Sequence, residues 1–373
     1  MWQPQGFYNQ YVLHTPIILS GDQAVRGLYN YPAARIAVIH GKSFFDKELF
    51  EVTFSKRDIS FFERSWKDEP DIASLTGTIH ELEKYRPDTI VAVGGGSVID
   101  GSKLCRLFYE FPYYQLGETR LPGEQLRTRF IAIPTTVGSG AEASSAAVFS
   151  DIHNQKKDMI VMQEFQPDVV VYDKRYVMGG SQRLLVTSSM DAMAHILEGY
   201  VSKQENYLID VLAEKGFLLL CTEMRKLLSG EEMDYQRLQY AGYIGGLVQN
   251  HCIVGAAHAI AHQLTEYNYS HSEAVALMLP SVIMLNACDK SVKNRYERIV
   301  QSAGFSDICT LILFFQELCG YVGIYERKDE LKALLKKLAE KKTFCENIRG
   351  DKGGKGNPAE MTDEYIKQLI RSI

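Results

Sequence analysis

The sequence predicts an α/β protein in two parts, with a parallel β-sheet in the amino-terminal half and helices alone in the carboxy-terminal half. Four short apolar runs rich in Val and Ile occur before residue 173, with helical segments between them. Beyond that point such runs become scarce, and long segments rich in Leu, Ala, Met, Glu and Lys replace them. Strands buried on both faces of a parallel sheet form continuous apolar runs. We therefore expect two domains, residues 1–178 and 179–373.

The individual elements follow from the same patterns. The expected strands are residues 36–39, 89–93, 130–133 and 169–172. The expected helical segments are residues 71–85, 191–228, 234–248 and 328–342. The last of these carries lysines opposite an apolar face, which is typical of a solvated helix rather than a docking surface. The glycine-rich segment 351–358 is predicted to be a turn, and it lacks the GxxxxGK[ST] order of a phosphate-binding P-loop.

Composition excludes several classes of protein. The chain has 373 residues, of which 46% are hydrophobic, and its 41 basic and 46 acidic side chains give a net charge of −5. The slightly negative net charge argues against a general nucleic-acid binder. The share of hydrophobic residues argues against disorder. No apolar run approaches the ~20 residues that span a bilayer, and the amino terminus lacks the features of a secretory signal. Seven cysteines without a CxxC pair indicate reduced thiols, so we expect a cytoplasmic protein with no membrane partner.

A glycine-rich turn follows the second predicted strand. Residues 88–104 contain a buried strand, then Gly94, Gly95, Gly96 and Ser97, then a helix. Glycines let the backbone approach a ligand closely, and the free N–H groups of a helix N-terminus attract phosphate. The turn lacks the GxGxxG order of the usual Rossmann fingerprint, and a tight turn without a ligand is the alternative. We favour a pyrophosphate site.

A second polar turn follows the third predicted strand. Thr135, Thr136 and Ser139 lie in a segment of small hydroxyl residues and glycines directly after residues 130–133. Since neighbouring parallel strands end at the same edge of a sheet, these side chains could close over the same ligand. Without the first turn, this segment would indicate only a loop.

Histidines gather in one part of the chain. Five of the nine lie between His195 and His271, and Asp191 precedes His195 by four residues, as His258 precedes His262. Residues four apart share one face of a helix. One carboxylate with two or three imidazoles from different elements forms a plausible divalent metal site. Each residue alone has a structural explanation, but a charged aspartate among apolar neighbours needs a partner that a cation would provide.

These motifs together resemble the iron-containing (group III) alcohol dehydrogenase family of the dehydroquinate synthase-like superfamily. The resemblance rests on the blocks GGGSxxDxxK at 94–103, PTTxGxGxE at 134–142, MDAxxHxxExY at 190–200 and HAxAHxL at 258–264. It implies an amino-terminal Rossmann-like dinucleotide-binding domain followed by an all-α metal-binding domain. It also implies that the metal ligands are Asp191, His195, His258 and His271, and that His262 takes part in proton transfer.

The resemblance implies cofactor contacts as well. Gly95, Gly96 and Ser97 match the pyrophosphate loop, and Asp100 matches a residue near the nicotinamide. Further matching contacts are Thr135, Thr136, Ser139 and Lys157, the last near the cofactor ribose. Ala141 stands where the family has a serine, so one hydroxyl is lost at that loop. After residues 36–39 the chain has Gly41, Lys42 and Ser43, without the carboxylate that NAD-preferring members often carry.

The resemblance thus predicts a metal-dependent enzyme that transfers a hydride between a nicotinamide cofactor and an alcohol, aldehyde or ketone. Lys42 and Ser43 favour NADP(H) over NAD(H), and Fe(II) is favoured over Zn(II). Two alternatives are a dehydroquinate synthase-like lyase that uses NAD within its cycle and a non-catalytic metal- or nucleotide-binding relative. Relatives are often dimers, so a homodimer or larger homo-oligomer is expected, whereas no short motif encodes the substrate.

Overall fold

A six-stranded parallel sheet forms the centre of the amino-terminal half. The computed structural model describes residues 15–42, 46–116, 125–151, 156–264 and 267–373. The strands follow the order β1-β8-β5-β4-β2-β3, and every neighbouring pair is parallel. Their bounds are β1 Ile17–Ser20, β2 Arg35–His40, β3 Asp58–Glu63, β4 Thr89–Gly94, β5 Arg129–Pro134 and β8 Val169–Tyr172. All six residues of β4 are buried, and the register pairs Gly94 with Pro134, so the two polar turns begin side by side.

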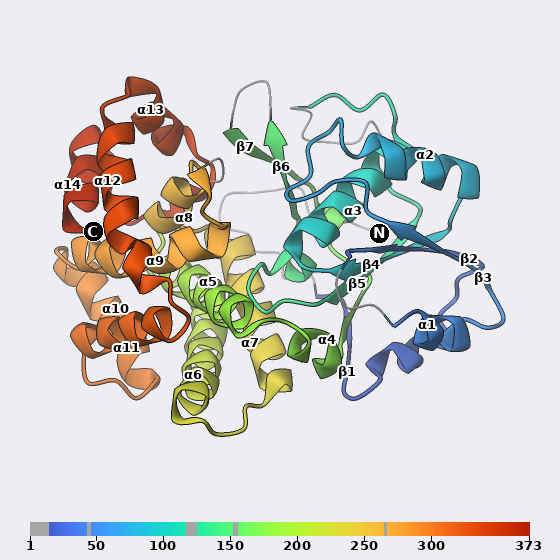
Figure 1. The fold of residues 1–373 in the computed structure, drawn as a ribbon, viewed down its shortest axis with the longest axis horizontal. Helices are drawn as coiled ribbons and strands as arrows, with labels where there is room; N and C mark the ends of the chain where they lie inside the picture. Colours follow the sequence, from blue (N-terminus) through green and yellow to red (C-terminus); the bar gives the residue numbers. More distant parts are fainter. Residues whose placement is uncertain (1–14, 43–45, 117–124, 152–155, 265–266) are drawn as a thin grey trace.

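Helices cover both faces of this sheet, as Figure 1 shows. Alternate residues of β4 explain the two layers, because Ile90 packs in one apolar cluster and Val91 in another on the opposite face. The elements that complete this half are α1 Lys47–Thr53, α2 Thr76–Tyr85, α3 Gly96–Glu110, α4 Lys174–Met178 and the antiparallel hairpin of β6 Ala146–Asp151 and β7 Lys156–Val161. The hairpin stands apart from the main sheet, at the side where the two halves meet (Figure 1).

Ten α-helices form most of the described part of the carboxy-terminal half. They are α5 Gln182–Tyr200, α6 Tyr207–Ser229, α7 Tyr235–Cys252, α8 Ala256–Ala261, α9 His271–Asn286, α10 Lys290–Ser302, α11 Ile308–Tyr321, α12 Lys328–Ala339, α13 Lys342–Gly350 and α14 Asp363–Ser372. Helix α5 is the central one, since every residue from Leu185 to Tyr200 is buried. A helix enclosed on all sides can hold ionisable groups away from water, and the buried part of α5 carries Asp191, His195 and Glu198.

The predicted fold class is confirmed, with corrections to single elements. Edge strands β1 and β3 and the β6–β7 hairpin were not predicted. Strand β1 is short and mostly exposed, and β3 and the hairpin mix polar with apolar residues. The helix expected from residue 71 begins at Thr76, since Asp71 and Ser74 bond to each other in a turn. The helical stretch 191–228 is divided between α5 and α6, and Asn206 caps the second helix. The boundary at 178/179 stays a prediction; it falls between α4 and α5.

Within the described residues, no single helix is long and apolar enough to cross a membrane. In these residues, Ile308–Tyr321 and Tyr325–Ala339 reach that length and apolar composition only when they are taken together. The chain bends by 103° between the two segments. Both contribute to the apolar core of the helical half, for example through the fully buried Phe315 and Leu335. Their apolar character is therefore that of core helices.

Candidate metal and cofactor site

A cavity of about 620 Å³ lies between the two halves. On the helical side it is lined by what we call the histidine wall, made of Asp191, His195, His258, His262 and His271. On the other side the turns after β4 and β5 form what we call the glycine wall, made of Gly96, Ser97, Asp100, Thr136 and Ser139. The two motif groups found in the sequence thus face one cavity, at the carboxyl ends of parallel strands where α/β proteins commonly bind ligands.

Three residues of the histidine wall form a compact group. Asp191 and His195 lie one turn apart on α5, and His258 lies on α8. One ligand atom from each lies within 4.8 Å of the other two, and all three residues are buried. The rings of His195 and His258 are stacked with 4.6 Å between centroids. This spacing suits ligands that share one ion.

The other two histidines lie next to this group. His271 is the first residue of α9, and its Nε2 is 3.7 Å from Oδ1 of Asp191. Its ring centroid is 5.3 Å from that of His258. His262 follows α8 and stacks on His271 with 5.2 Å between centroids. All five residues are brought together, although only Asp191, His195 and His258 form the tight group.

Several atoms of this wall are buried without a hydrogen bond. Among the described residues, no hydrogen-bond partner is found for Oδ1 of Asp191, Nδ1 of His195, Nε2 of His258 or Nδ1 of His271. Buried polar atoms in native proteins nearly always have a partner, and orphaned ones call for an explanation. Oδ1 of Asp191 and Nε2 of His258 lie 3.4 Å apart within the compact group that includes His195, so a divalent transition metal bound there would satisfy them. The nitrogen of His271 that faces Asp191 is Nε2.

The titration of these groups follows from burial and from their neighbours. Burial lowers the pKa of His195 to about 4, and burial together with the charge of Lys157 lowers the pKa of His271 well below its ordinary value. Burial lowers the pKa of His258 as well, but the nearby carboxylates of Asp191 and Glu198, the second of them hydrogen-bonded to Nδ1, outweigh it and raise the pKa to about 9. Although burial opposes it, the neighbouring imidazoles hold the pKa of Asp191 below its usual range. Metals bind an ionised carboxylate and neutral imidazoles, so the shifts of Asp191, His195 and His271 favour metal binding, whereas His258 has to release a proton when a metal binds.

Glu198 orients His258. Nδ1 of His258 donates to the carboxylate of Glu198 at 2.6 Å, which turns Nε2 toward Asp191. The same carboxylate accepts the backbone N–H groups of Gly255 at 3.0 Å and Ala257 at 2.7 Å, at the start of α8. Sequence analysis did not single out Glu198 as functional. The signal that could have found it is an acidic residue three positions after His195, within an apolar helical segment.

The glycine turn is packed too closely to admit side chains. A Cβ atom at Gly94 would lie 2.5 Å from Cβ of Val98, and one at Gly96 would lie 2.6 Å from Cβ of Ser139. Helix α3 begins at Gly96, directly after the strand, so its free N–H groups face the cavity edge. Gly96, Thr136 and Ser139 line the cavity. The predicted contacts Gly94, Gly95 and Thr135 are not among the described residues that line it.

The polar side chains of the glycine wall bond mostly to the protein itself. Oγ of Ser97 accepts from Arg64 at 2.8 Å and also donates to the backbone oxygen of Asp68. Asp100 accepts the backbone N–H of Val148 at 3.2 Å, which ties α3 to the hairpin. The N–H of Thr135 donates to the carbonyl of Gly94 at 3.1 Å and joins the two turns. These contacts with the surrounding protein fix the shape of the two turns.

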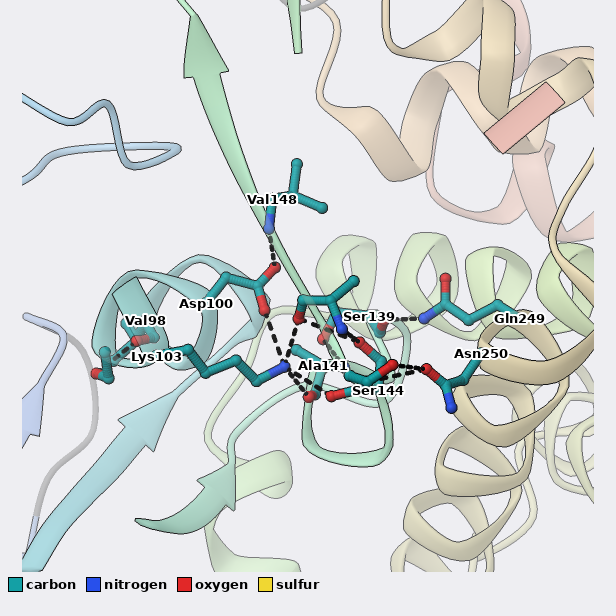
Figure 2. A network of polar contacts seen from close by, with 12 residues as sticks. Val98, Asp100, Lys103, Ser139, Ala141, Ser144, Val148, Gln249 and Asn250 are labelled. Atoms are coloured by element: carbon teal, nitrogen blue, oxygen red, sulfur yellow. Dashed lines mark hydrogen bonds and ion pairs between the residues drawn. The ribbon is translucent and has the colours of Figure 1, made fainter. Parts of the chain in front are cut away.

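A buried lysine anchors the second turn, as Figure 2 shows. Nζ of Lys103 donates to the carbonyls of Ala141, Ser144 and Ala146 at 2.7, 3.0 and 2.6 Å and lies 3.4 Å from Asp100. Burial lowers the pKa of Lys103 and raises the pKa of Asp100. Lys103 is the last residue of the GGGSxxDxxK block at 94–103, but the sequence predicted no role for it in the site. Through these three carbonyls, Lys103 holds the loop that carries Ser139 against α3.

Helix α7 holds the same loop from the other half (Figure 2). Nε2 of Gln249 donates to the carbonyl of Ser139 at 2.7 Å. Oδ1 of Asn250 accepts both the backbone N–H and the hydroxyl of Ser145, each at 2.9 Å. The second turn is therefore connected to α3 of the first half and to α7 of the second, which fixes the distance between the two walls.

The remaining predicted cofactor residues lie in different surroundings. Lys157 on β7 lines the cavity and pairs with Glu69, with 5% of its side chain exposed. Gly41 and Lys42 follow β2 outside the cavity, and Lys42 is 83% exposed with Nζ 3.9 Å from Glu63. Ser43 lies outside the described residues. Although Gly41 lacks a carboxylate, the end of the neighbouring strand β3 thus provides one.

Comparison with known families covers nearly the whole chain. The family described as iron-containing alcohol dehydrogenase matches residues 16–174. The carboxy-terminal part of the Fe-containing alcohol dehydrogenase family matches residues 185–373. The chain belongs to the iron-containing alcohol dehydrogenase family. It is therefore an oxidoreductase of the alcohol dehydrogenase type, as the sequence motifs predicted.

Individual relatives agree with this assignment. The chain is 27% identical over 314 residues to an alcohol dehydrogenase of Thermococcus barophilus, covering 81% of each protein. It is 24% identical to an NADPH-dependent butanol dehydrogenase of Clostridium saccharobutylicum, covering 82% of this chain and 81% of the relative. The structure of an iron-containing alcohol dehydrogenase from Thermococcus thioreducens superposes with a TM-score of 0.86 at 26% identity, covering 95% of this chain and 97% of that one.

Proposed function

We propose that this alcohol dehydrogenase uses a metal ion and a nicotinamide cofactor to interconvert an alcohol with an aldehyde or ketone. The observation that carries the proposal is the pair of walls around one cavity. Four buried donor atoms of the histidine wall lack hydrogen bonds, and a helix N-terminus with a glycine turn stands opposite. The site therefore combines the donor set of a metal with the backbone geometry of a pyrophosphate site.

In this proposal the cofactor binds along the glycine wall. The turn Gly94, Gly95 and Gly96 with Ser97 receives the pyrophosphate, since close backbone approach and free N–H groups favour an anion there. Asp100, Thr135, Thr136 and Ser139 contribute further contacts or support, and Lys157 reaches the cavity near His271. The nicotinamide would supply the hydride acceptor. The position of the loop around Ser139 would then set the distance between the nicotinamide ring and the histidine wall.

The metal would be held by Asp191, His195, His258 and His271. When bound, a divalent ion there supplies positive charge that stabilises the negative charge developing on the substrate oxygen. Glu198 orients His258, and the apolar core around α5 excludes water from the ligands. We propose Fe(II) because the chain belongs to the iron-containing family, with Zn(II) as the alternative because it uses the same ligand types.

Oxidation of the alcohol then requires the removal of one hydride and one proton. The bound nicotinamide would take up the hydride of the C–H bond, a C=O bond would form, and the proton of the hydroxyl group would have to be carried away by a residue of the protein. His262 lines the cavity beside His271 and is the residue we assign to carry the proton away. Reduction of an aldehyde or ketone follows the same steps in reverse.

We further propose a preference for NADP(H). Gly41 leaves the end of β2 without a carboxylate, and the exposed ammonium of Lys42 is available to a 2′-phosphate, with Ser43 as a second contact. The 3.9 Å pair of Lys42 with Glu63 is weak enough to be exchanged for a phosphate. The relative from Clostridium saccharobutylicum, named NADPH-dependent, supports the same choice.

The two alternatives are less well supported. The family match favours a dehydrogenase over a dehydroquinate synthase-like lyase. Relatives named as dehydrogenases favour an enzyme over a non-catalytic metal- or nucleotide-binding protein, which could use the same buried donor atoms. A net change in reduced nicotinamide with substrate separates a dehydrogenase from both alternatives, because a lyase regenerates its NAD within each cycle.

The decisive experiment is a substrate panel with both cofactors. Anaerobically purified protein is analysed for metal and assayed with alcohols and with aldehydes, following the absorbance of reduced nicotinamide. We expect about one metal ion per chain, turnover with NADP(H) at higher kcat/KM than with NAD(H), and loss of turnover after chelation that Fe(II) restores. A clear NADH preference would remove the NADP proposal alone. Turnover that persists in metal-free protein would remove the metal from the proposal.

A further inference from the structure

The glycine-rich segment near the carboxyl terminus reaches the site. Asp351 follows α13, and its Oδ2 lies 2.9 Å from Nδ1 of His262. Its other oxygen accepts the backbone N–H groups of Gly353 at 2.8 Å and Gly354 at 3.3 Å. Only 7% of the Asp351 side chain and 11% of the His262 side chain are exposed. A turn that the sequence indicated as structural thus contacts the histidine proposed to carry the proton.

The glycines explain how this turn comes so close. A Cβ atom at Gly353 would lie 3.2 Å from Val254 and 3.4 Å from the ring of His262. A Cβ atom at Gly354 would lie 2.9 Å from Ala259 on α8 and would clash with Met361. Larger residues at these positions would push the turn away from α8. Glycine is therefore needed for close approach, so that the carboxylate of Asp351 can reach the imidazole.

The turn is held on its other side as well. Nζ of Lys352 donates to Oδ1 of Asp158 at 2.7 Å and to the backbone oxygen of Met159 at 3.1 Å, both on β7. Lys352 is thus occupied by the hairpin, and both amides of the turn are occupied by Asp351. These contacts favour a rigid support for His262 over a site that captures a ligand of its own.

We propose that Asp351 is a positioning residue that acts on the reaction through His262. The ionised carboxylate accepts the Nδ1 proton of His262, which leaves the lone pair of the ring on Nε2 and fixes the ring plane. Two backbone N–H groups stabilise the negative charge on the carboxylate. The inference rests on the proposed role of His262 and adds that the carboxy-terminal turn determines the tautomer and orientation of that histidine.

A double-mutant cycle tests the proposal. Asp351→Asn keeps the size of the side chain but presents an amide group either to the glycine amides or to Nδ1 of His262, so one set of contacts is lost. We expect kcat to fall by at least about tenfold, with metal content and the KM for the cofactor unchanged. In the His262→Ala background the same substitution should have no further effect, because a residue that acts through His262 has nothing left to act on.

Asp363→Asn is the matched control. It removes a half-exposed carboxylate that pairs with Arg349 on α13 and lies outside the cavity, so kcat should stay within about twofold of the wild-type value. Equal kcat in wild type and Asp351→Asn would overturn the proposal. Additive losses in the double variant would also overturn it, since they would show that Asp351 acts on the fold and not through His262.

An independent measurement separates this inference from the proposed function. In ¹⁵N-histidine-labelled, zinc-loaded protein, the tautomer of His262 is expected to carry its proton on Nδ1 and to change in Asp351→Asn. If the wild-type protein turns over no alcohol, the proposed function fails while the tautomer still tests the contact. An unchanged His262 signal in Asp351→Asn would overturn the inference even in an active enzyme.

Discussion

The two walls of the cavity satisfy their polar groups in different ways. In the glycine wall, Ser97 and Asp100 are hydrogen-bonded within the protein, and Lys103 behind them has three carbonyl partners. In the histidine wall, Asp191, His258 and their neighbours keep buried atoms without hydrogen bonds. The polar groups of the first wall are satisfied as folded, whereas those of the second would be satisfied by the proposed cation. The glycine wall should therefore keep its shape without ligands, and the histidine wall should depend on the metal.

The strongest test of this contrast is His258→Ala. Loss of one imidazole leaves the donor set incomplete, so metal binding and turnover should be lost together, with kcat/KM falling by about 1,000-fold or more. Cofactor binding should stay within a few-fold of the wild-type value, because the glycine wall is unaffected. Metal content, steady-state kinetics and cofactor titration by fluorescence measure the three quantities. Normal turnover by a metal-free variant would contradict the role assigned to the wall.

Lys103→Met tests the glycine wall in turn. The methionine leaves the carbonyls of Ala141, Ser144 and Ala146 without their donor, and we expect a loss of about 3 kcal/mol in the free energy of unfolding. The loop around Ser139 should loosen and weaken cofactor binding by about tenfold, while metal content stays unchanged. Urea unfolding and cofactor titration measure both effects.

The control for this variant is Lys84→Met. Lys84 forms an exposed pair with Glu81 on α2, with 58% of the lysine side chain exposed, and such pairs contribute little to stability. Its unfolding curve should overlay that of the wild-type protein. If Lys103→Met lost metal rather than cofactor, the assignment of the two walls to two ligands would be wrong.

Glu198→Gln gives a smaller effect on the histidine wall. The amide cannot accept the Nδ1 proton of His258 and both backbone N–H groups as the carboxylate does. His258 should be less well oriented, and metal affinity should fall about 10- to 100-fold. Competition with a chelator measures the affinity, and Glu205→Gln, a 71% exposed position beyond α5, should leave it unchanged. Equal affinity in Glu198→Gln would show that His258 needs no support.

The sequence predicted what depends on local patterns. The turn at Gly94–Ser97 follows a continuous apolar strand, and Asp191 with His195 shows helical spacing, so both were found with their neighbours. Partners that meet only in three dimensions were not found. Asp351 and His262 are 89 residues apart, and Glu198 and His258 are 60 apart, so no spacing rule connects them.

The missed elements have a common physical cause. The β6–β7 hairpin alternates between residues that line the cavity, such as Val148 and Met159, and residues buried in the apolar core, such as Phe149 and Ile160, so it lacks a continuous apolar run. Strands β1 and β3 lie at the sheet edges and are partly exposed. Yet the hairpin contributes Val148, Met159 and Lys157 to the cavity. The parts of a site that come from edges and hairpins are the ones that sequence periodicity describes least well.

The smallest expected effect concerns Lys42, which belongs to neither wall. Because Lys42 is 83% exposed, its attraction to a 2′-phosphate is weakened by solvent and salt. Lys42→Ala should lower kcat/KM for NADPH by about three- to tenfold, with the loss shrinking at high salt, and should leave kcat/KM for NADH unchanged. Lys47→Ala, at a 60% exposed position on the following helix α1, is the control and should affect neither cofactor. An equal loss with both cofactors would mean that Lys42 supports the strand end rather than the phosphate, and the choice of cofactor would then have to be decided inside the cavity.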